Sequence, residues 1–247
     1  DSKPRLSYNF VPELSIPDLS SMNLCNAAQK LELERLAGLY TTENGSMDEA
    51  YAYKLQNVRR GVNTDWIRAP LRVPFSHTHS LSLSGRAQKI DYRTSLRFSD
   101  KYGVMKGDNR RNYTLNFSIG YHMRDKLTLR YTANYSLTDA KESPYGDFSA
   151  YTRLNPYDTP FDEYGNLVKA FNFDPEDTST SGDGHQVNPL YNATLSSFET
   201  TRDQTLRNTV DAKWYVTKDF FITGQFNVDI KTNQYDRYTS PEDATYL

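Results

Sequence analysis

A run of strict alternation between Asn112 and Leu137 constrains the fold of this chain more than any other feature. The segment reads NYTLNFSIGYHMRDKLTLRYTANYSL, with an apolar side chain at every second position, a short polar interruption, and then the same alternation again. Successive side chains of a β-strand point to opposite faces of its sheet, so the pattern predicts two strands that each have one apolar and one polar face. The interruption at 124–126 predicts a tight turn between them.

The same alternation occurs seven times along the chain. Its apolar positions, segment by segment, are Leu6, Tyr8 and Phe10; Phe75, His77, His79, Leu81 and Leu83; Ile90, Tyr92, Thr94, Leu96 and Phe98; Tyr113, Leu115, Phe117, Ile119, Tyr121 and Met123; Leu127, Leu129, Tyr131, Ala133, Tyr135 and Leu137; Leu206, Val210, Ala212, Trp214 and Val216; Phe220, Ile222, Phe226, Val228 and Ile230. Ser, Thr, Asn, Arg, Asp and Lys fill nearly all the positions between them. We therefore expect an all-β, antiparallel fold with seven strands.

The connections between these strands alternate strictly in length. Short turns lie near 85–89, 124–126 and 217–219, and long connections run through about 12–74, 99–111 and 138–204. Strands of ten to thirteen residues, with short turns at one end and long loops at the other, are typical of a transmembrane β-barrel. A strand needs about 9–11 residues to cross the hydrocarbon layer, and only one of its faces contacts lipid. A barrel therefore explains long, regular strands in a chain that is polar on average.

The apolar positions identify the residues expected to face outer-membrane lipid. Aromatic residues lie at both margins of this face, Trp214 and Phe220 near short turns and Tyr113 and Tyr135 towards long loops, as interfacial girdles would. The predicted lipid-facing residues are Leu115, Phe117, Ile119, Tyr121, Leu129, Tyr131, Trp214 and Phe226. Charges of both signs on the opposite face suit a wet interior or a plug surface. The outer face of a soluble sandwich would look similar, so strand length and turn alternation decide for the barrel.

Composition and motifs limit the classes of function. The 247 residues carry a net charge of −2 with a pI of about 6.1, which argues against binding of nucleic acid. Mean hydropathy is −0.76, and no apolar run approaches the ~18 residues of a membrane helix. The single cysteine, Cys25, excludes an internal disulfide. No nucleophile elbow, phosphate loop or HExxH motif occurs, so we expect neither an enzyme nor a cofactor.

A helix is predicted within the first long connection. Asp18, Ser20 or Ser21 can cap a segment whose apolar side chains over 24–31 share one face, and the helix is expected to end near Gly38.

A second helix is predicted in the same connection. Residues 46–49, Ser-Met-Asp-Glu, form a capping-box pattern, and the helix should run to Arg60 and stop at Gly61. We therefore expect a helical insertion over about 18–61.

The third long connection holds the candidate substrate-binding residues. It is rich in turn formers and in aromatic rings, which can stack on sugars or hold a peptide at low entropic cost. The candidates are Tyr145, Phe148, Tyr151, Tyr157, Phe161 and Tyr164. The alternative is that these rings pack against neighbouring loops or a partner protein.

Two groups of residues resemble metal ligands, but neither predicts a metal. His77 and His79 share a face two residues apart, a spacing that metal sites use, but the sequence offers no third ligand nearby. The acidic residues of the third connection lack the regular spacing of a calcium loop, so we interpret them as solvated. They are Asp174, Glu176, Asp177 and Asp183.

Six segments carry a more specific signal. They read KPRLSYNF, SIPDLSSMNLCNAAQKLELERLAGLY, NTDWIRAPLRVPFSHTHSLSLSG, GVMKG, KESPYGDFSAYTRLNPYDTPFDEYGNL and NPLYNATL. These segments resemble the SusC/RagA-type TonB-dependent outer-membrane transporters of the Bacteroidota, from Lys3 to about Arg237. The resemblance implies a barrel of about 22 strands with a plug inside it. It also implies location in the outer membrane, energy relayed by TonB-ExbB-ExbD, and a SusD-like surface lipoprotein as a lid.

The resemblance also implies that this chain is part of a larger barrel. No plug or TonB box precedes Lys3, and Leu247 falls inside a loop, so residues 1–247 are expected to hold about seven of about 22 strands. The short first strand, rising from the periplasm, would make the long connections extracellular. We expect part of a nutrient importer, for a glycan or alternatively a peptide. A passive porin or structural barrel, and a soluble secreted β-rich binding module, are the competing functions.

Overall fold

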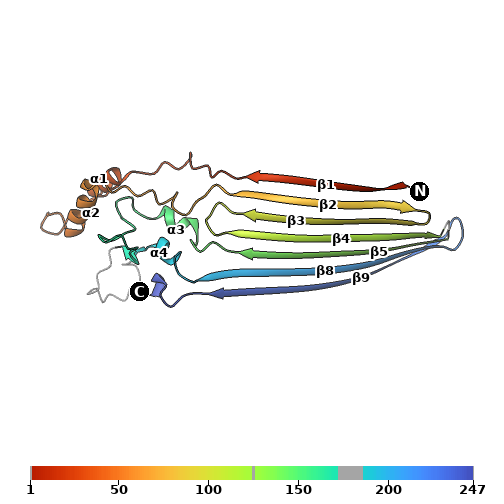
Figure 1. Ribbon diagram of the computed structural model, residues 1–247. Helices are drawn as coiled ribbons and strands as arrows, with labels where there is room; N and C mark the ends of the chain where they lie inside the picture. Colours follow the sequence, from red (N-terminus) through yellow and green to blue (C-terminus); the bar gives the residue numbers. More distant parts are fainter. Residues whose placement is uncertain (1, 124–125, 172–185, 247) are drawn as a thin grey trace.

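A computed structural model describes residues 2–123, 126–171 and 186–246. It shows one long antiparallel sheet with helices and loops gathered at one end (Figure 1). The strands lie side by side in chain order, as β1 (Ser2–Leu14), β2 (Phe75–Ala87), β3 (Ile90–Tyr102), β4 (Asn109–Met123), β5 (Leu127–Lys141), β8 (Phe198–Tyr215) and β9 (Phe221–Tyr238). The predicted all-β fold with seven antiparallel strands is confirmed.

The strands are longer than the sequence pattern indicated. β1 continues to Leu14, beyond the apolar run that ends at Phe10, and β8 begins at Phe198 rather than after residue 204. The long connections are therefore 15–74, 103–108 and 142–197, each shorter than expected. Pairing continues where hydropathic alternation stops, because polar partners replace apolar ones across the strands. Asp139, for example, pairs with Arg202 and accepts its Nε–H at 2.6 Å.

Helix α1 (Ala27–Leu36) begins later than predicted. Its N-cap is Asn26, whose side chain accepts the Gln29 N–H at 2.9 Å, while the Gln29 side chain accepts the Asn26 N–H at 3.1 Å. The predicted caps at Asp18, Ser20 and Ser21 are wrong, because the Asp18 carboxylate is used in a local turn, where it accepts the Ser20 N–H. The helix ends close to Gly38, as expected, and the positive φ of 76° there suits glycine.

Helix α2 (Glu49–Arg59) also has a different cap from the predicted one. Asp48 caps it by accepting the Tyr51 N–H at 2.8 Å. Ser46 does not, because its hydroxyl donates to Asn44 in the preceding turn. Gly61, with φ of 83°, follows the helix as predicted. Among the described residues no helix is long and apolar enough to span a membrane.

The third connection is more structured than its turn-forming residues indicated. It contains α3 (Phe148–Thr152), a two-stranded sheet of β6 (Ala170–Phe171) and β7 (Gln186–Val187), and α4 (Pro189–Asn192). Outside this connection, a 3-10 turn, η1 (Ala244–Tyr246), follows β9. The four acidic residues that were weighed as calcium ligands lie outside the described residues, as do two of the three residues predicted to turn between β4 and β5.

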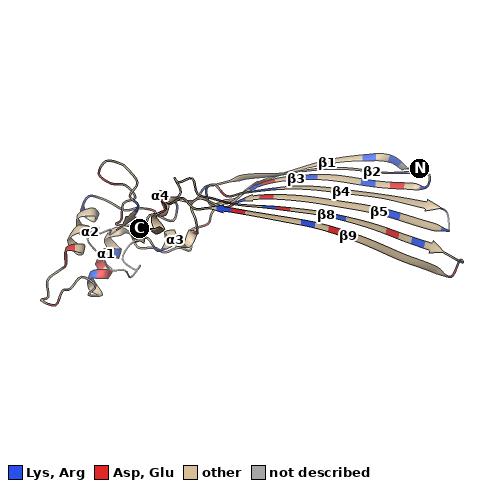
Figure 2. Cartoon of the chain, turned by 90° about the horizontal axis from the view of Figure 1, so that it is seen from below, with Lys and Arg blue, Asp and Glu red and all other residues tan. Residues whose placement is uncertain are grey.

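The register separates an apolar face of the main sheet from a polar face. All eight residues predicted to face lipid lie on the apolar face, in rows such as Tyr92–Ile119–Tyr131–Val210. The polar face carries mainly Ser, Thr and Asn, with interspersed charges that Figure 2 shows along the strands. That the apolar face contacts lipid remains a prediction.

The apolar face forms a band that runs obliquely across the strands. On β1 the band covers Leu6 to Leu14, and on β9 it covers Ile222 to Ile230, counted in both strands from the short turns towards the long connections. The cross-strand partners from β1 to β9 place Leu6 in the same row as Val228. The band on β9 therefore lies six residues closer to the short turns than the band on β1. Six residues at ~3.3 Å each, over six strand spacings of ~4.8 Å, correspond to an angle of about 35°.

This angle is what a barrel in a membrane requires. Barrel strands tilt by about 35–45°, so a band parallel to the membrane plane must cross the strands obliquely. On β4 the apolar run from Tyr113 to Met123 covers ~33 Å along the strand, or about 27 Å of height at that tilt. The apolar band of outer-membrane barrels is about 25 Å tall. A soluble sandwich gives no reason for an apolar band with this slope and height.

Candidate functional site

The long connections converge beyond one end of the sheet and pack into a unit that we call the loop head (Figure 1). It consists of residues 15–74, 103–108, 142–171 and 186–197. Backbone atoms join the first and third connections: the Thr64 N–H donates to the Pro156 carbonyl at 2.8 Å. The Trp66 indole Nε1–H donates to the Asn155 carbonyl, also at 2.8 Å. This bond anchors the first connection against the third.

The short connection 103–108, which reads GVMKGD, links the other two. The Lys106 Nζ donates to the Ala69 carbonyl at 2.6 Å, and the Ser143 hydroxyl donates to the Lys106 carbonyl at 2.6 Å. Gly107 has a φ of 84°, and a Cβ there would lie 2.3 Å from the Pro144 Cδ. Only glycine permits this close approach, so the second connection is fixed against the third.

Two hydrophobic cores stabilise the loop head. One contains Ala27, Leu31, Tyr40 and Tyr157, and the other Trp66, Tyr151, Leu154 and Phe171. Each joins the first connection to the third. Full burial of a large apolar side chain contributes about 1.5–3 kcal/mol, so each core favours the arrangement in which these connections pack together. The loop head is therefore a packed structure on top of the sheet.

The structure divides the six predicted substrate-binding rings into three groups. Tyr151 and Tyr157 are each only 1% exposed and belong to the cores. Tyr145 and Phe148 are half-buried, and Tyr145 also packs against the second core. Phe161 and Tyr164 are 48% and 89% exposed. Of the six rings, these last two are therefore the most accessible to a ligand, and the alternative of loop packing accounts for the two tyrosines of the cores.

A buried ionic cluster ties both helices to the third connection. The Glu34 carboxylate accepts hydrogen bonds from the hydroxyls of Tyr40 and Tyr157, the latter at 3.0 Å, and lies 3.3 Å from the Lys30 Nζ. The Lys54 Nζ donates to the Tyr40 hydroxyl at 3.0 Å and lies over the rings of Tyr40 and Tyr157, at 4.9 and 5.0 Å from their centroids. The charge of Glu34 is thus satisfied by groups from three different segments.

The pKa values of two buried carboxyl groups in this region are shifted in opposite directions. Burial alone would raise the pKa of Glu34, but its hydrogen bonds to Tyr40, Tyr157 and Lys30 outweigh burial and lower it. Burial raises the pKa of Asp158 to about 6, because its carboxylate has one weak side-chain donor, the Asn155 Nδ2 at 3.3 Å. Asp158 is only 3% exposed, so its carboxylate has little access to water.

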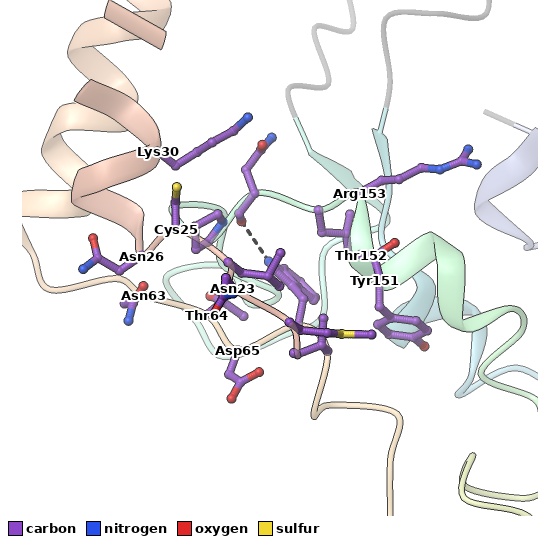
Figure 3. A pocket seen from close by; sticks show the side chains of 17 residues that line it. Asn23, Cys25, Asn26, Lys30, Asn63, Thr64, Asp65, Tyr151, Thr152 and Arg153 are labelled. Carbon is purple, nitrogen blue, oxygen red and sulfur yellow. Dashed lines mark hydrogen bonds between the residues drawn. The ribbon is translucent and has the colours of Figure 1, made fainter. Parts of the chain in front are cut away.

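A first groove of about 490 Å³ opens on the loop head (Figure 3). Its walls are 22–26, 63–67 and 151–156, and Lys30 and Arg153 come from opposite sides of it. The side chains of Asn23, Asn26 and Asn63 also line it. Carboxamide, guanidinium and ammonium donors can hold hydroxyl, carbonyl or carboxylate oxygens, so the groove suits a polar ligand.

A second groove of about 940 Å³ lies between α2 and residues 158–171. Tyr53 and Phe161, each about half-exposed, line it together with Asp158. The Arg60 guanidinium lies 3.9 Å from the Glu163 carboxylate, so these exposed side chains join its two walls. Aromatic and charged groups in one groove again suit a polar, oligomeric ligand.

Sequence reasoning did not find the grooves or the ionic cluster. Glu34 and Tyr157 are 123 positions apart, so no local pattern relates them.

His77 and His79 contact each other and the ring of Phe98 on the apolar face. Among the described residues, no three His, Cys, Asp or Glu side chains gather as a metal site would require.

The chain resembles known proteins in sequence and in fold. Over 254 aligned residues it is 22% identical to TonB-dependent receptor P26 of Formosa agariphila, covering all of this chain and 23% of that protein. No protein-family profile matches. The resemblance to TonB-dependent receptors is confirmed. The chain spans about a quarter of the length of this curated relative.

Solved structures show the same fold. A chain of the RagAB peptide transporter matches with a TM-score of 0.71 and 15% identity, covering 94% of this chain and 28% of that one. Chains of the RagAB peptide importer in its closed-closed and open-open states match with TM-scores of 0.72 and 0.71, at 14% and 16% identity. Both matches cover 98% of this chain, and they cover 30% and 29% of the respective RagAB chains. These relatives are a receptor and transporters, not enzymes, in agreement with the absence of catalytic motifs.

Proposed function

We propose that this chain forms part of the wall and extracellular surface of an outer-membrane, TonB-dependent nutrient importer. The observation that carries the proposal is the similarity of the whole chain to a TonB-dependent receptor. The oblique apolar band and the packed loop head at one end of the sheet support it. Under this proposal the apolar face contacts outer-membrane lipid, and TonB-ExbB-ExbD supplies the energy through a part of the protein outside these residues.

The substrate is proposed to be a glycan, with a peptide as the second candidate. Both grooves of the loop head offer hydrogen-bond donors and acceptors, and the second adds the rings of Tyr53 and Phe161, which can stack on a sugar. The peptide alternative is favoured because this chain shares its fold with a chain of the RagAB peptide transporter. A SusD-like lipoprotein is the proposed partner above the loop head, where Tyr164 is 89% exposed.

Uptake in cells carrying the full-length gene tests the proposal. Labelled oligosaccharides and oligopeptides are supplied to cells with and without functional TonB. Loss of uptake without TonB is expected, whereas uptake that persists would support the passive porin. The class of compound that accumulates decides between glycan and peptide.

A pair of variants then tests the first groove. Arg153→Ala removes an exposed guanidinium from its wall and should lower uptake several-fold. Arg59→Ala removes another exposed cation, at the end of α2 and outside both grooves, and should leave uptake unchanged. Equal effects of the two substitutions would remove the groove from the substrate path.

A further inference from the structure

The second groove of the loop head has an acidic lining, in contrast to the first. Its charged residues are Glu49, Asp158, Asp162, Glu163 and Arg60. Among the described lining residues Arg60 is the only cation, and it already lies 3.9 Å from the Glu163 carboxylate. The first groove is lined by two cations and one carboxylate. The two grooves therefore present opposite charges to a ligand.

Local sequence explains both walls of the second groove. Glu49, Tyr53 and Asn57 are four residues apart on α2, so they share one face of the helix. Across the groove, the Asp162 carboxylate is held in a turn, where it accepts two backbone N–H groups at 2.9 and 2.8 Å. Helix α2 lies towards the end of the loop head that points away from the sheet (Figure 1). The groove is therefore remote from the strands.

Asp158 distinguishes this groove from an ordinary solvated acidic surface. The residue is buried although it lines the groove. Within the described part of the chain its carboxylate forms no ion pair, and the one side-chain hydrogen bond that it accepts is the 3.3 Å bond from Asn155. Lys54 attracts this carboxylate, but its ammonium donates to the Tyr40 hydroxyl and does not line the groove. A desolvated carboxylate of this kind is stabilised by a cation that arrives with a ligand.

The uncharged groups of the second groove also suit a cation. The Asn57 Nδ2 donates to the Tyr157 carbonyl at 3.3 Å, so Asn57 offers a ligand its acceptor, Oδ1. Tyr53 and Phe161 are 54% and 48% exposed, and the face of an aromatic ring attracts a positive charge. An ammonium group has three hydrogen-bond donors and no acceptor, so it matches these acceptors and ring faces.

We propose that the second groove binds a primary ammonium group of the imported nutrient, with Asp158 as its counter-ion. This proposal rests on the proposed function, because it assumes that the loop head receives the nutrient. An amino sugar and a lysine side chain carry the same group, so either a glycan or a peptide could supply it. Charge would then select among molecules that are otherwise alike.

An organic cation fits the second groove better than a metal ion. Among the described residues, no three His, Cys, Asp or Glu side chains gather closely enough to coordinate a metal. The volume of about 940 Å³ instead suits part of an oligomer. The third connection as a whole, residues 142–197, contains nine Asp and Glu against one Arg and one Lys. Its field therefore attracts cations towards this end of the molecule.

Binding to the purified full-length protein tests the proposal with two matched pairs of probes. One pair is a glucosamine oligomer and its N-acetylated counterpart, and the other is a lysine-containing peptide and the same peptide with acetyllysine. Within each pair the probes differ only in their ammonium groups. The variants are Asp158→Asn and Glu49→Gln, and Glu49 is exposed, so its substitution does not disturb a core. The control is Glu43→Gln, which removes an exposed carboxylate of the first connection outside the groove.

At least one amine-bearing probe should bind about tenfold more tightly than its acetylated counterpart, and the pair that shows this identifies the source of the ammonium. Asp158→Asn and Glu49→Gln should each reduce this preference several-fold, and Glu43→Gln should not. High salt should also reduce it, because salt screens the attraction. Equal affinity or no binding within both pairs, or a preference that survives both groove substitutions, would overturn the proposal.

Uptake by cells separates this proposal from the proposed function. Uptake that requires TonB but shows no preference for amine-bearing probes would overturn the ammonium site alone. Amine-selective binding to the purified protein, without any uptake that requires TonB, would overturn the importer and leave the selectivity of the groove in place.

Discussion

Replacing Ile119 with arginine puts a charge where the oblique band places the middle of the membrane. Ile119 lies on the apolar face of β4, level with Tyr92 and Tyr131, and is 37% exposed. It is six residues from Tyr113 and four from Met123, the two ends of the apolar run. At ~3.3 Å per residue and a tilt of about 35°, it lies about 16 and 11 Å from the two margins.

An arginine at the bilayer midplane of a barrel costs roughly 2–4 kcal/mol. That cost lowers the folding equilibrium constant by roughly 30- to 1,000-fold, since 1.36 kcal/mol corresponds to a factor of ten. Thr132→Arg is the matched control, because Thr132 is next to Tyr131 and points to the polar face. Its cross-strand neighbours, Ser118 and Thr209, are uncharged, so we expect a cost below about 1 kcal/mol. Ser118 would be a poorer control, because it pairs with Arg93.

Both variants of the full-length protein are refolded into lipid vesicles and unfolded with urea. The expected result is a free energy of unfolding lowered by roughly 2–4 kcal/mol for Ile119→Arg and nearly unchanged for Thr132→Arg. Equal losses, or a greater loss for Thr132→Arg, would mean that the apolar face does not contact lipid. The membrane interpretation of β4 would then be wrong.

Three further predictions concern the loop head. Tyr157→Phe removes the hydroxyl that donates to Glu34 and should cost about 1–3 kcal/mol, measured as faster proteolysis of the loops in the folded protein. The Asp158 pKa is raised from 3.8 to about 6, so the folded head holds this proton more tightly than the unfolded chain does. The stability of the loop head should therefore fall by up to about 3 kcal/mol as the pH rises from about 4 to above 6, and its proteolysis should become faster. Asp158→Asn should abolish this dependence of proteolysis on pH. Tyr164→Ala should leave proteolysis unchanged, because the ring is 89% exposed. The same variant should weaken uptake if the ring contacts the substrate or the partner. Unchanged growth on the nutrient would exclude that role.

The strands were predictable because their signal is local. Alternation with a period of two fixes which side chains share a face, whatever the strand pairs with. The ends of the strands were not predictable, since Asp139 and Arg202 continue the pairing with charged partners where the apolar pattern has stopped. The helix caps failed for a related reason. Several polar residues near each helix start could serve, and the local turns of Asp18 and Ser46 decided against them.

The sequence by itself determined the fold class, the seven strands and the two faces of the sheet, because these follow from residue type and period alone. The tertiary structure decided which aromatic rings are available to a ligand. Tyr157 is buried where its hydroxyl donates to Glu34, 123 positions away, whereas Tyr164, in the same connection, is 89% exposed. It also decided which charges lie together on the polar face: Arg86, Asp91 and Arg130 come from different strands and lie in one row only because of the register. Contacts between distant segments depend on how whole elements pack, and no short window of sequence contains that information.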